Sequence, residues 1–520
     1  MSASQLPPEL LLGIFGAGLS SVDLAHVSRA CRHFRTIVEP ILYTSVALAS
    51  TDKVRSFILA IQGRSSRAQA VRSLELDWFD DIVEEEEPPV ANGFWEFHTK
   101  GAFDDGATKL TDEKKGPTPI DQEADARGMA PELCYAIAEL VPSAHVVLLL
   151  DMLPRLQSLR VVPSPVEFWF WAAFPNPCDP DIPKRLPQGL LSLESLEVHY
   201  GPDFETSDVT ELNDGAGYAH VKLICTLLLP NLRRLSFAGE DGDDNEWGMH
   251  YTEDLERRGP FVDMDRLKSR SGVTQLELCG TTLLPEHLLP QVLDMLAAPE
   301  SVHVEQADEF DFAPFDEFLG RPTLRSLTLV EYPDGYFARN PERQPLHTLG
   351  KRDHLTHVAL PVQALAPFED GDLVRRVPRG IEHLDLAYPS LFVLDDQLDR
   401  LLQLVHKLGE RGSRVRRLTV RPILGDSGHL RAACAASGIM LDQEPCVGAP
   451  ADPFDAYGAG ITYRSPLPTY DNDEFDGYDD FGDDHGSYFP VGFRGRYGDE
   501  EDDEEVDNDS DGDGTEADDG

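Results

Sequence analysis

One hydrophobic pattern, apolar-x-x-apolar-x-apolar, recurs along the chain from residue 43 onward. It occupies residues 43–48, 71–76, 156–161, 193–198, 232–237, 273–278, 324–329, 355–360, 381–386 and 415–420. Its last four positions alternate between polar and apolar, which is the period of two that a β-strand requires. Each copy therefore predicts a strand. Val302-x-Val304 predicts a further, weaker strand between the copies at 273–278 and 324–329.

Helical periodicity precedes most of these predicted strands. We expect helices over Pro131–Leu140, Ala219–Leu229, Glu286–Leu296, Asp395–Gly409 and Gly428–Ser437. A strand and a helix that recur together, neither able to bury its apolar side alone, are typical of a solenoid. The alternative is an ordinary α/β domain with a parallel sheet, which the ten copies of one pattern make less favourable.

The repeated pattern resembles that of leucine-rich repeats, whose strands carry L-x-x-L-x-L. Two features depart from that family: the Asn or Cys that follows its strands is mostly absent, and most intervals here are 26 to 41 residues. We therefore expect an irregular, leucine-rich-repeat-like β/α solenoid, horseshoe-shaped, over residues 43–447. Acidic loop insertions are expected at about 80–128 and 239–260.

Three short helices are expected in residues 1–42. Leu10 and Ile14 share one face of the first helix. Leu11 and Phe15 share the neighbouring face. A unit of about 40 residues is marginal alone, so we expect it to bury its excess apolar surface on a partner. A plain helical cap on the solenoid is the alternative that these residues leave open.

Two local signals set the expected ends of the second and third helices. Ser20-x-x-Asp23 is a capping box and predicts the start of the second helix. Pro40 interrupts the pattern of the third helix, which predicts that this helix ends or kinks near Glu39.

The order of these residues resembles the F-box motif. The matching elements are L-P-x-E-L-x-x-x-I-F at 6–15, Leu19, D-L at 23–24 and V-S-R-A-C-R-x-F at 27–34. Phe34 departs from the family, which often has Trp there. The resemblance implies binding to the Skp adaptor of a Skp–cullin–F-box ubiquitin ligase. The candidates to build or face the adaptor interface are Leu6, Pro7, Leu10, Leu11, Ile14, Phe15, Leu24, Val27, Cys31 and Phe34.

The resemblance also predicts the role of the chain. It is expected to be a non-catalytic substrate receptor that binds the adaptor through residues 1–42 and a target protein through the solenoid. The alternative is a non-degradative interaction scaffold that uses the F-box only to join an adaptor complex. Residues between the apolar strand positions form the open face of the sheet, and the candidate target-binding residues are Glu197, Glu277, Arg417 and Arg421.

Charge and cysteine usage narrow the choice of partners. The net charge is −48, and residues 451–520 carry 24 acidic against three basic residues. Such a charge argues against nucleic acid and anionic membranes as partners. Residues 448–520 lack apolar periodicity and are expected to form a disordered acidic tail. Seven cysteines without a C-x-x-C pair, and no secretory signal, predict a soluble protein of the cytoplasm, the nucleus or both.

Three short motifs invite a chemical interpretation that their context does not support. Residues 507–518 resemble an EF-hand loop but lack flanking amphipathic helices. Gly425-Asp426-Ser427-Gly428 lacks the framework of a serine protease. His354-x-x-His357 spans the start of a predicted strand, so the two side chains should face opposite sides. We therefore expect no metal, cofactor or catalytic residue.

Overall fold

The computed structural model describes thirteen segments of the chain. They are residues 7–16, 19–77, 117–162, 168–177, 185–200, 219–239, 262–279, 288–306, 312–331, 345–365, 373–387, 395–421 and 428–443. The expected loop at 240–260, the expected tail at 448–520 and residues 425–427 lie outside them.

Twelve strands form a single parallel sheet. They are β1 (Ser45–Leu48), β2 (Ser73–Asp77), β3 (Ser158–Val162), β4 (Ser195–Tyr200), β5 (Arg234–Gly239), β6 (Gln275–Cys279), β7 (Ser301–Gln306), β8 (Ser326–Glu331), β9 (His357–Pro361), β10 (His383–Ala387), β11 (Arg417–Arg421) and β12 (Met440–Gln443). Strand order in the sheet follows chain order throughout. Every predicted strand is present, and the weak one is β7. The terminal strand β12 has no counterpart in the predicted set.

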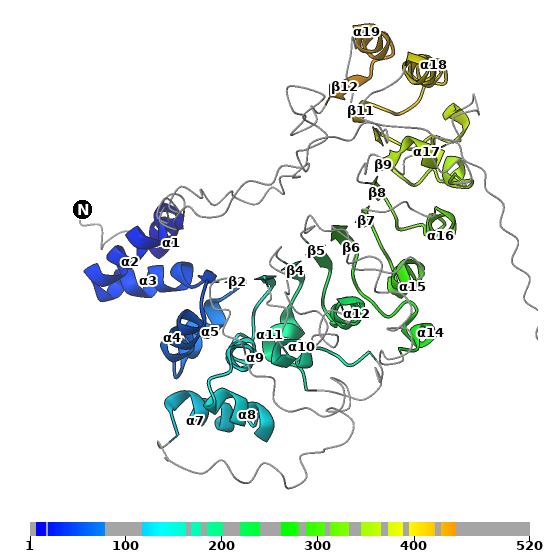
Figure 1. Cartoon of the computed structure of the whole chain (residues 1–520). Coiled ribbons are helices and arrows are strands. Elements are labelled where there is room, and N and C mark those ends of the chain that lie inside the picture. The colour runs from blue at the N-terminus through cyan, green and yellow to red at the C-terminus, as the bar shows by residue number, and fades with distance from the viewer. Residues whose placement is uncertain are drawn as a thin grey trace, which may run out of the picture. The chain divides into compact units, whose positions relative to one another are not determined.

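Helices occupy most of the described connections between strands. They are α1 (Pro8–Gly16), α2 (Ser21–Ala30), α3 (Arg32–Leu42), α4 (Thr51–Ile61), α5 (Ser65–Ala70), α7 (Pro119–Ala126), α8 (Pro131–Ala138), α9 (Pro142–Met152), α10 (Phe168–Ala172), α11 (Gln188–Ser192), α12 (Ala219–Leu227), α14 (Met264–Leu267), α15 (Leu288–Met295), α16 (Ala313–Phe318), α17 (Val362–Leu365), α18 (Asp395–Glu410) and α19 (Gly428–Ala436), with 3₁₀ turns η4 (Leu349–Lys351) and η5 (Leu373–Arg375). The five predicted helices are α8, α12, α15, α18 and α19. In Figure 1, α12, α15 and α16 lie along one side of the strands.

Alternation along each strand separates the buried face of the sheet from its open face. In β2, Leu74 and Leu76 are fully buried, whereas Glu75 between them is partly exposed. The strands pair in register, so Leu74 stacks on Leu159 and the same column continues to Leu418. These side chains and those of the helices form one continuous core from Leu48 to Ile439. Burying each such side chain contributes about 1.5–3 kcal/mol.

Helix α9 is the most deeply buried helix in the described part of the chain, and every residue from Ser143 to Met152 is buried. An aromatic cluster of Phe170, Trp171 and Phe174, with ring centroids 5.0–5.3 Å apart, packs into the same core.

No single described helix is long and apolar enough to cross a membrane. Helices α8 and α9 reach that length and composition only together, and they are bent by 120°.

Helices α1–α3 form a three-helix unit with a small hydrophobic core of its own. It is joined to the sheet through Arg67 of α5, which forms an ion pair with Glu39 of α3. The guanidinium of Arg67 also lies 5.1 Å from the centre of the Tyr43 ring, which stacks on Phe57 of α4. The three-helix unit therefore contacts the first helices of the sheet region through both charged and aromatic groups.

The structure corrects two local predictions. Helix α3 continues through Pro40 to Leu42, so the first of the two expected outcomes, an end near Glu39, is wrong, whereas the kink stays a prediction. Pro40 lies close to the C-terminal end, where a missing N–H removes a single helical hydrogen bond. The expected loop at 80–128 is also wrong over its last residues, where Thr118 and Asp121 form a capping box that starts α7. The capping box of Ser20 and Asp23 is confirmed.

Gly380 lies where two successive segments of the chain approach each other so closely that a side chain does not fit. An added Cβ at this position would overlap the backbone carbonyl oxygen of Asp353 and lie 3.0 Å from that of Leu355. Because backbone atoms cannot rotate away, Gly380→Ala should lower the free energy of unfolding by about 1–3 kcal/mol. Urea unfolding measures this change. Gly13→Ala, on α1 with open space around the added Cβ, is the control and should not destabilise the protein.

Candidate functional site

The three-helix unit divides its apolar residues between a core and a surface. Leu11 and Phe15 of α1 and Leu24 of α2 are buried together with two residues of α3. The Phe15 ring meets the edge of the Phe34 ring at a centroid distance of 5.7 Å. Hydrogen bonds from Ser20 fix the start of α2 and lower the pKa of Asp23. The unit therefore needs only part of its apolar surface to fold.

The remaining apolar side chains are exposed on α1 and around the start of α2. Leu10 and Ile14 expose 56% and 55% of their surface, and Val22 exposes 62%. Large apolar side chains that are exposed together commonly mark a protein interface. Leu12 and Leu19 are exposed as well. We call the exposed apolar residues Leu10, Ile14, Leu19 and Val22 the α1–α2 patch. Leu12 lies about 200° around α1 from Leu10 and therefore faces another side of the helix.

The predicted adaptor-binding residues fall into three groups. Leu11, Phe15 and Leu24 are buried in the core of the unit, and Val27 and Phe34 pack against it. Pro7, Leu10, Ile14 and Cys31 are exposed, and Leu6 lies outside the described residues. The exposed residues Leu12, Leu19 and Val22 were not among the predicted adaptor-binding residues. Val22 directly precedes the D-L pair, and that proximity was the available signal.

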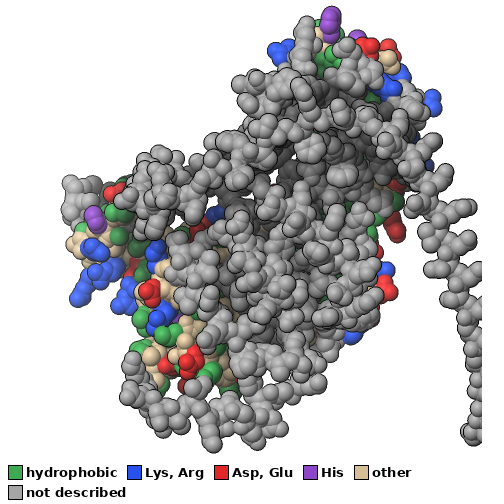
Figure 2. All heavy atoms as spheres, viewed as in Figure 1, with side chains coloured by type: hydrophobic (Ala, Val, Ile, Leu, Met, Phe, Trp, Pro, Cys, Tyr) green, Lys and Arg blue, Asp and Glu red, His purple; other side chains and the backbone are tan. Residues whose placement is uncertain are grey.

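Basic side chains lie on the same unit. Arg29 near the end of α2 and Arg32 and Arg35 of α3 are exposed. Figure 2 shows basic side chains gathered over the end of the molecule that α1–α3 form. Residues 1–42 carry three arginines against three acidic residues and are neutral overall, but the three arginines form a local cluster of positive charge. It favours a partner with acidic groups near its apolar contact surface.

The open face of the sheet carries a row of polar side chains in register. Arg160 of β3 lies between Glu75 of β2 and Glu197 of β4 and forms ion pairs with both. Glu197 also contacts His199, with 2.5 Å between the carboxylate oxygen and Nε2. The His199 imidazole, and then the Arg160 guanidinium, hold the pKa of Glu197 below its ordinary value despite partial burial. Charges at this end of the face are therefore paired.

At the far end of the sheet the predicted target-binding residues Arg417 and Arg421 are both paired with carboxylates. Arg417 of β11 forms an ion pair with Asp442 of β12, at 2.5 Å, and Arg421 forms one with Asp385 of β10, at 3.0 Å. Asp442 belongs to the strand that sequence reasoning missed. The side chain of Asp385, between the apolar positions of β10, is only 9% exposed, and it lies against Arg421.

The four predicted target-binding residues are not brought together. Glu197 and Glu277 occupy the same register row, separated by Ser236 of β5. Arg417 and Arg421 lie on β11, five strands beyond β6, or about 24 Å away at the usual strand spacing. A single small ligand cannot span both pairs, and only an extended protein surface can. Their role in target binding stays a prediction.

Two histidines occupy the open face between these ends. His357 of β9 and His383 of β10 are in register, and their rings meet edge to face at 4.4 Å. His383 also lies 3.0 Å from the hydroxyl of Thr419 on β11. Burial, followed by the positive charges of His383, His303 and Arg421, lowers the pKa of His357 to about 4. His357 is therefore neutral near pH 7.

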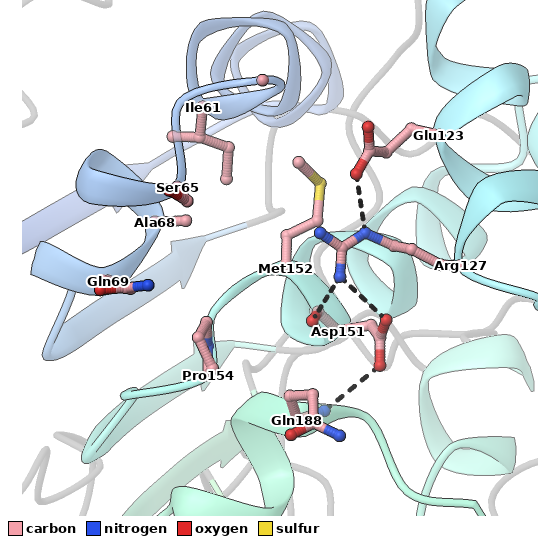
Figure 3. Close-up of a pocket in the computed structure, with 11 residues that line it drawn as sticks. Ile61, Ser65, Ala68, Gln69, Glu123, Arg127, Asp151, Met152, Pro154 and Gln188 are labelled. Carbon is pink, nitrogen blue, oxygen red and sulfur yellow. Dashed lines mark hydrogen bonds and ion pairs between the residues drawn. The ribbon is translucent and has the colours of Figure 1, made fainter.

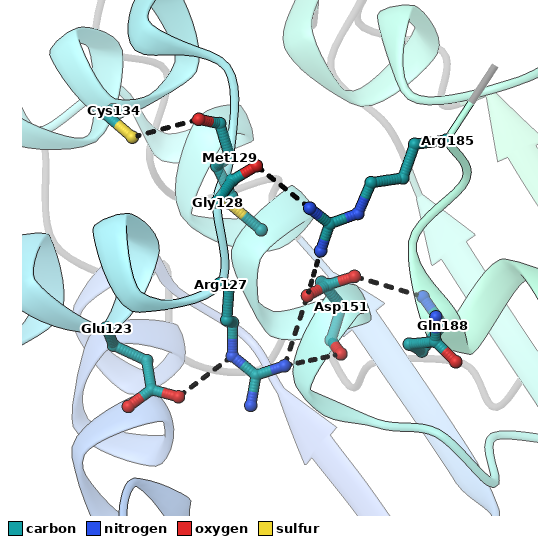
Figure 4. Close-up of polar contacts among 8 residues, drawn as sticks. All are labelled: Glu123, Arg127, Gly128, Met129, Cys134, Asp151, Arg185 and Gln188. Carbon is teal, nitrogen blue, oxygen red and sulfur yellow. Dashed lines mark hydrogen bonds and ion pairs between the residues drawn. The ribbon is translucent and has the colours of Figure 1, made fainter.

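A pocket of about 410 Å³ lies among α4, α5, α7, α9 and α11 (Figure 3). Arg127 crosses it, donating from Nε to Glu123 at 2.9 Å and from Nη1 to the Asp151 carboxylate at 3.1 Å. Asp151, only 4% exposed, also forms an ion pair with Arg185 and accepts a hydrogen bond from the backbone N–H of Gln188 (Figure 4). These two arginines face two carboxylates, so the cluster is balanced in charge. We interpret this cluster as a structural contact that holds α7 against α9.

Comparison with known families bears on the three-helix unit alone. A family model described as F-box-like matches residues 3–49. No curated protein matches the chain. The match agrees with the expected F-box, so the N-terminal segment is an F-box-like domain. Domains of this class generally bind Skp-type adaptors. The α1–α2 patch is exposed on this domain.

The lowered pKa of His357 predicts a pH dependence of stability. The folded pKa of about 4 lies below the ordinary 6.5, so the unfolded chain takes up a proton first as the pH falls. Stability should therefore decrease as the pH falls from about 6.5 to about 4. His357→Gln should lose less stability than the wild type over this range in urea unfolding. His406→Gln, exposed on α18, is the control, and an equal loss in all three proteins would contradict the assignment.

Proposed function

We propose that the chain is the substrate-recognition subunit of a Skp–cullin–F-box ubiquitin ligase. The F-box-like domain carries this proposal, because it keeps a separate core and leaves the α1–α2 patch exposed. The patch would bind the adaptor. Arg29, Arg32 and Arg35 would face acidic groups at the rim of that contact.

The sheet region would hold the target protein. We interpret it as a degenerate leucine-rich-repeat solenoid, because each strand pairs in register with its neighbours in chain order. Its open face carries ion pairs, histidines and serines on adjacent strands, whereas its other face is buried under helices. A polar surface on rigid strands suits recognition of a protein target.

The chain would contribute no catalytic group of its own. In this role it acts by proximity, raising the local concentration of target lysines near a thioester that another subunit carries. The Arg67–Glu39 ion pair and the Tyr43–Phe57 stack would hold the domain and the first repeats in a fixed relation. Such a ligase subunit would work in the cytoplasm, the nucleus or both.

A non-degradative scaffold is the second candidate, because an adaptor-binding domain joined to a protein-binding sheet fits both roles. The two differ in one component. A substrate receptor brings a cullin with its adaptor, whereas a scaffold binds the adaptor alone. Purification of the full chain with its adaptor, followed by probing for a cullin, separates the two candidates.

Charge placed in the α1–α2 patch should abolish adaptor binding. Leu10→Asp or Ile14→Asp would bury a carboxylate in the contact and cost at least about 2 kcal/mol, or roughly 30-fold in affinity. Both positions are exposed, so the domain should still fold. Binding of purified Skp-type adaptor to the full chain measures the effect. Leu59→Asp, 49% exposed on α4, is the matched control and should bind normally; wild-type affinity in both patch variants would rule out this surface.

Reversal of charge on the open face should change which target is captured. The double variant Arg417→Glu, Arg421→Glu breaks the pairs with Asp442 and Asp385 and should reduce capture at least several-fold in proximity labelling. Arg414→Glu with Arg416→Glu is the control, because both residues are exposed and precede β11.

The acidic end of the face needs its own variant. Glu197→Lys with Glu277→Lys should alter capture if the target spans that end of the sheet. If neither this pair nor the arginine pair changes the labelled proteins, the target binds elsewhere, and the insertions at 80–128 and 239–260 become the leading candidates.

A further inference from the structure

Two neighbouring strands place four potential metal ligands on one patch of the open face. Glu277 of β6 is directly opposite His303 of β7 in the parallel register. Cys279 and Glu305 lie two residues further along the same two strands. Because side chains alternate along a strand, all four project from the same face. Cys279, His303 and Glu305 are half-buried, and Glu277 is exposed.

The ligand atoms of three of these residues are already close. One donor atom from each of Cys279, His303 and Glu305 lies within 4.8 Å of the other two, and this is the one such group of three among the described residues. His303 Nε2 is 2.7 Å from a carboxylate oxygen of Glu305. The carboxylate of Glu277 is 3.8 Å from the sulfur of Cys279. The array thus gathers a thiol, an imidazole and two carboxylates.

We propose that Cys279, His303 and Glu305 bind a zinc ion. Thiolate and imidazole ligands favour Zn²⁺ over Mg²⁺ and Ca²⁺, which prefer oxygen alone. A tetrahedral zinc site with bonds of 2.0–2.3 Å needs donor atoms about 3.5 Å apart. The three donor atoms already lie within 4.8 Å of one another, so side-chain rotation alone would bring them to that distance. A water molecule or Glu277 would supply the fourth ligand.

The charges and protons of this site balance. Zinc binding breaks the hydrogen bond between His303 and Glu305, and the proton of the neutral imidazole moves from Nε2 to Nδ1 so that Nε2 can bind the ion. It also replaces the S–H bond of Cys279 with an S–Zn bond. The thiol proton passes to solvent, with the nearby Glu277 carboxylate placed to accept it first. A thiolate and one carboxylate then neutralise the two positive charges of the ion. Without metal, burial followed by the charges of Glu305 and Glu277 raises the pKa of Cys279, so zinc must displace a firmly held proton.

This site is independent of the adaptor role proposed above, and it shares one residue, Glu277, with the predicted target-binding face. Its position suggests a local consequence, since one ion would tie β6 to β7 more firmly than the side-chain hydrogen bond that Cys279 already makes with Glu305. The ion would stabilise the folded chain in proportion to its occupancy, because the unfolded chain does not bring these residues together.

Cobalt substitution in the full-length, untagged and metal-free chain tests the proposal. Co²⁺ takes the place of zinc and gives a thiolate-to-cobalt charge-transfer band only when sulfur is a ligand. Titration in excess Mg²⁺, which occupies carboxylate-only sites, should give this band with saturation at about one equivalent. Zinc should then displace cobalt and remove the band. Zinc should also raise the melting temperature of the wild type.

Variants assign the ligands. Cys279→Ser should abolish the band, and His303→Gln or Glu305→Gln should weaken cobalt binding by about 100-fold or more. His199→Gln is the matched control, because His199 and Glu197 form the same two-residue-spaced pair on β4. Cys134→Ser controls for a half-buried thiol elsewhere. Both controls should bind as the wild type does, and circular dichroism checks that each variant is folded.

Three results would overturn the site. One is the absence of a charge-transfer band at one equivalent of cobalt in the folded wild type. Another is a band that persists unchanged in Cys279→Ser. The third is wild-type affinity in both His303→Gln and Glu305→Gln. Zinc uptake without the cobalt–thiolate band would show only adventitious binding by carboxylates.

Discussion

Parallel register is the constraint on which the rest of this structure depends. In β2 to β8 each strand buries two apolar side chains on either side of a more exposed residue, and the next strand repeats this in the same frame. A shift of one residue in any strand would turn its leucines to the open face and its charges into the core. The same constraint aligns Glu75 with Arg160 and Glu277 with His303, so the core and the polar surface are set together.

Alternating apolar residues were sufficient to locate almost every strand, because burial of one face imposes the period of two. β12 was not predicted because Met440 is 52% exposed and the strand carries no complete six-residue pattern. Helix α7 was not predicted because its composition is that of a loop. The Thr118 cap and the burial of Ile120 stabilise this helix. Pro40 misled the prediction for α3 because packing of Val38 and Ile41 outweighs one lost hydrogen bond.

The candidate sites were less predictable than the fold, since they depend on contacts between distant residues. Motif spacing located the three-helix unit. It did not show which of the neighbouring residues Leu10 and Leu11 is exposed and which is buried, because that depends on how the three helices pack. On the sheet, the positions of Arg417 and Arg421 were predictable, but their partners Asp442 and Asp385 depended on an unpredicted strand and on burial. The grouping of Cys279 with His303 required the register of β6 and β7, which no local pattern encodes.

The terminal position of β12 has a further consequence for the open face. In the described sheet β12 has a single strand neighbour, β11, so its backbone amides should exchange with solvent sooner than those of central strands. Fraying of these four residues would carry Asp442 away from Arg417 and expose an uncompensated guanidinium while the other strands stay paired. The surface charge at this end of the sheet thus follows a local opening equilibrium, and not the global stability of the protein.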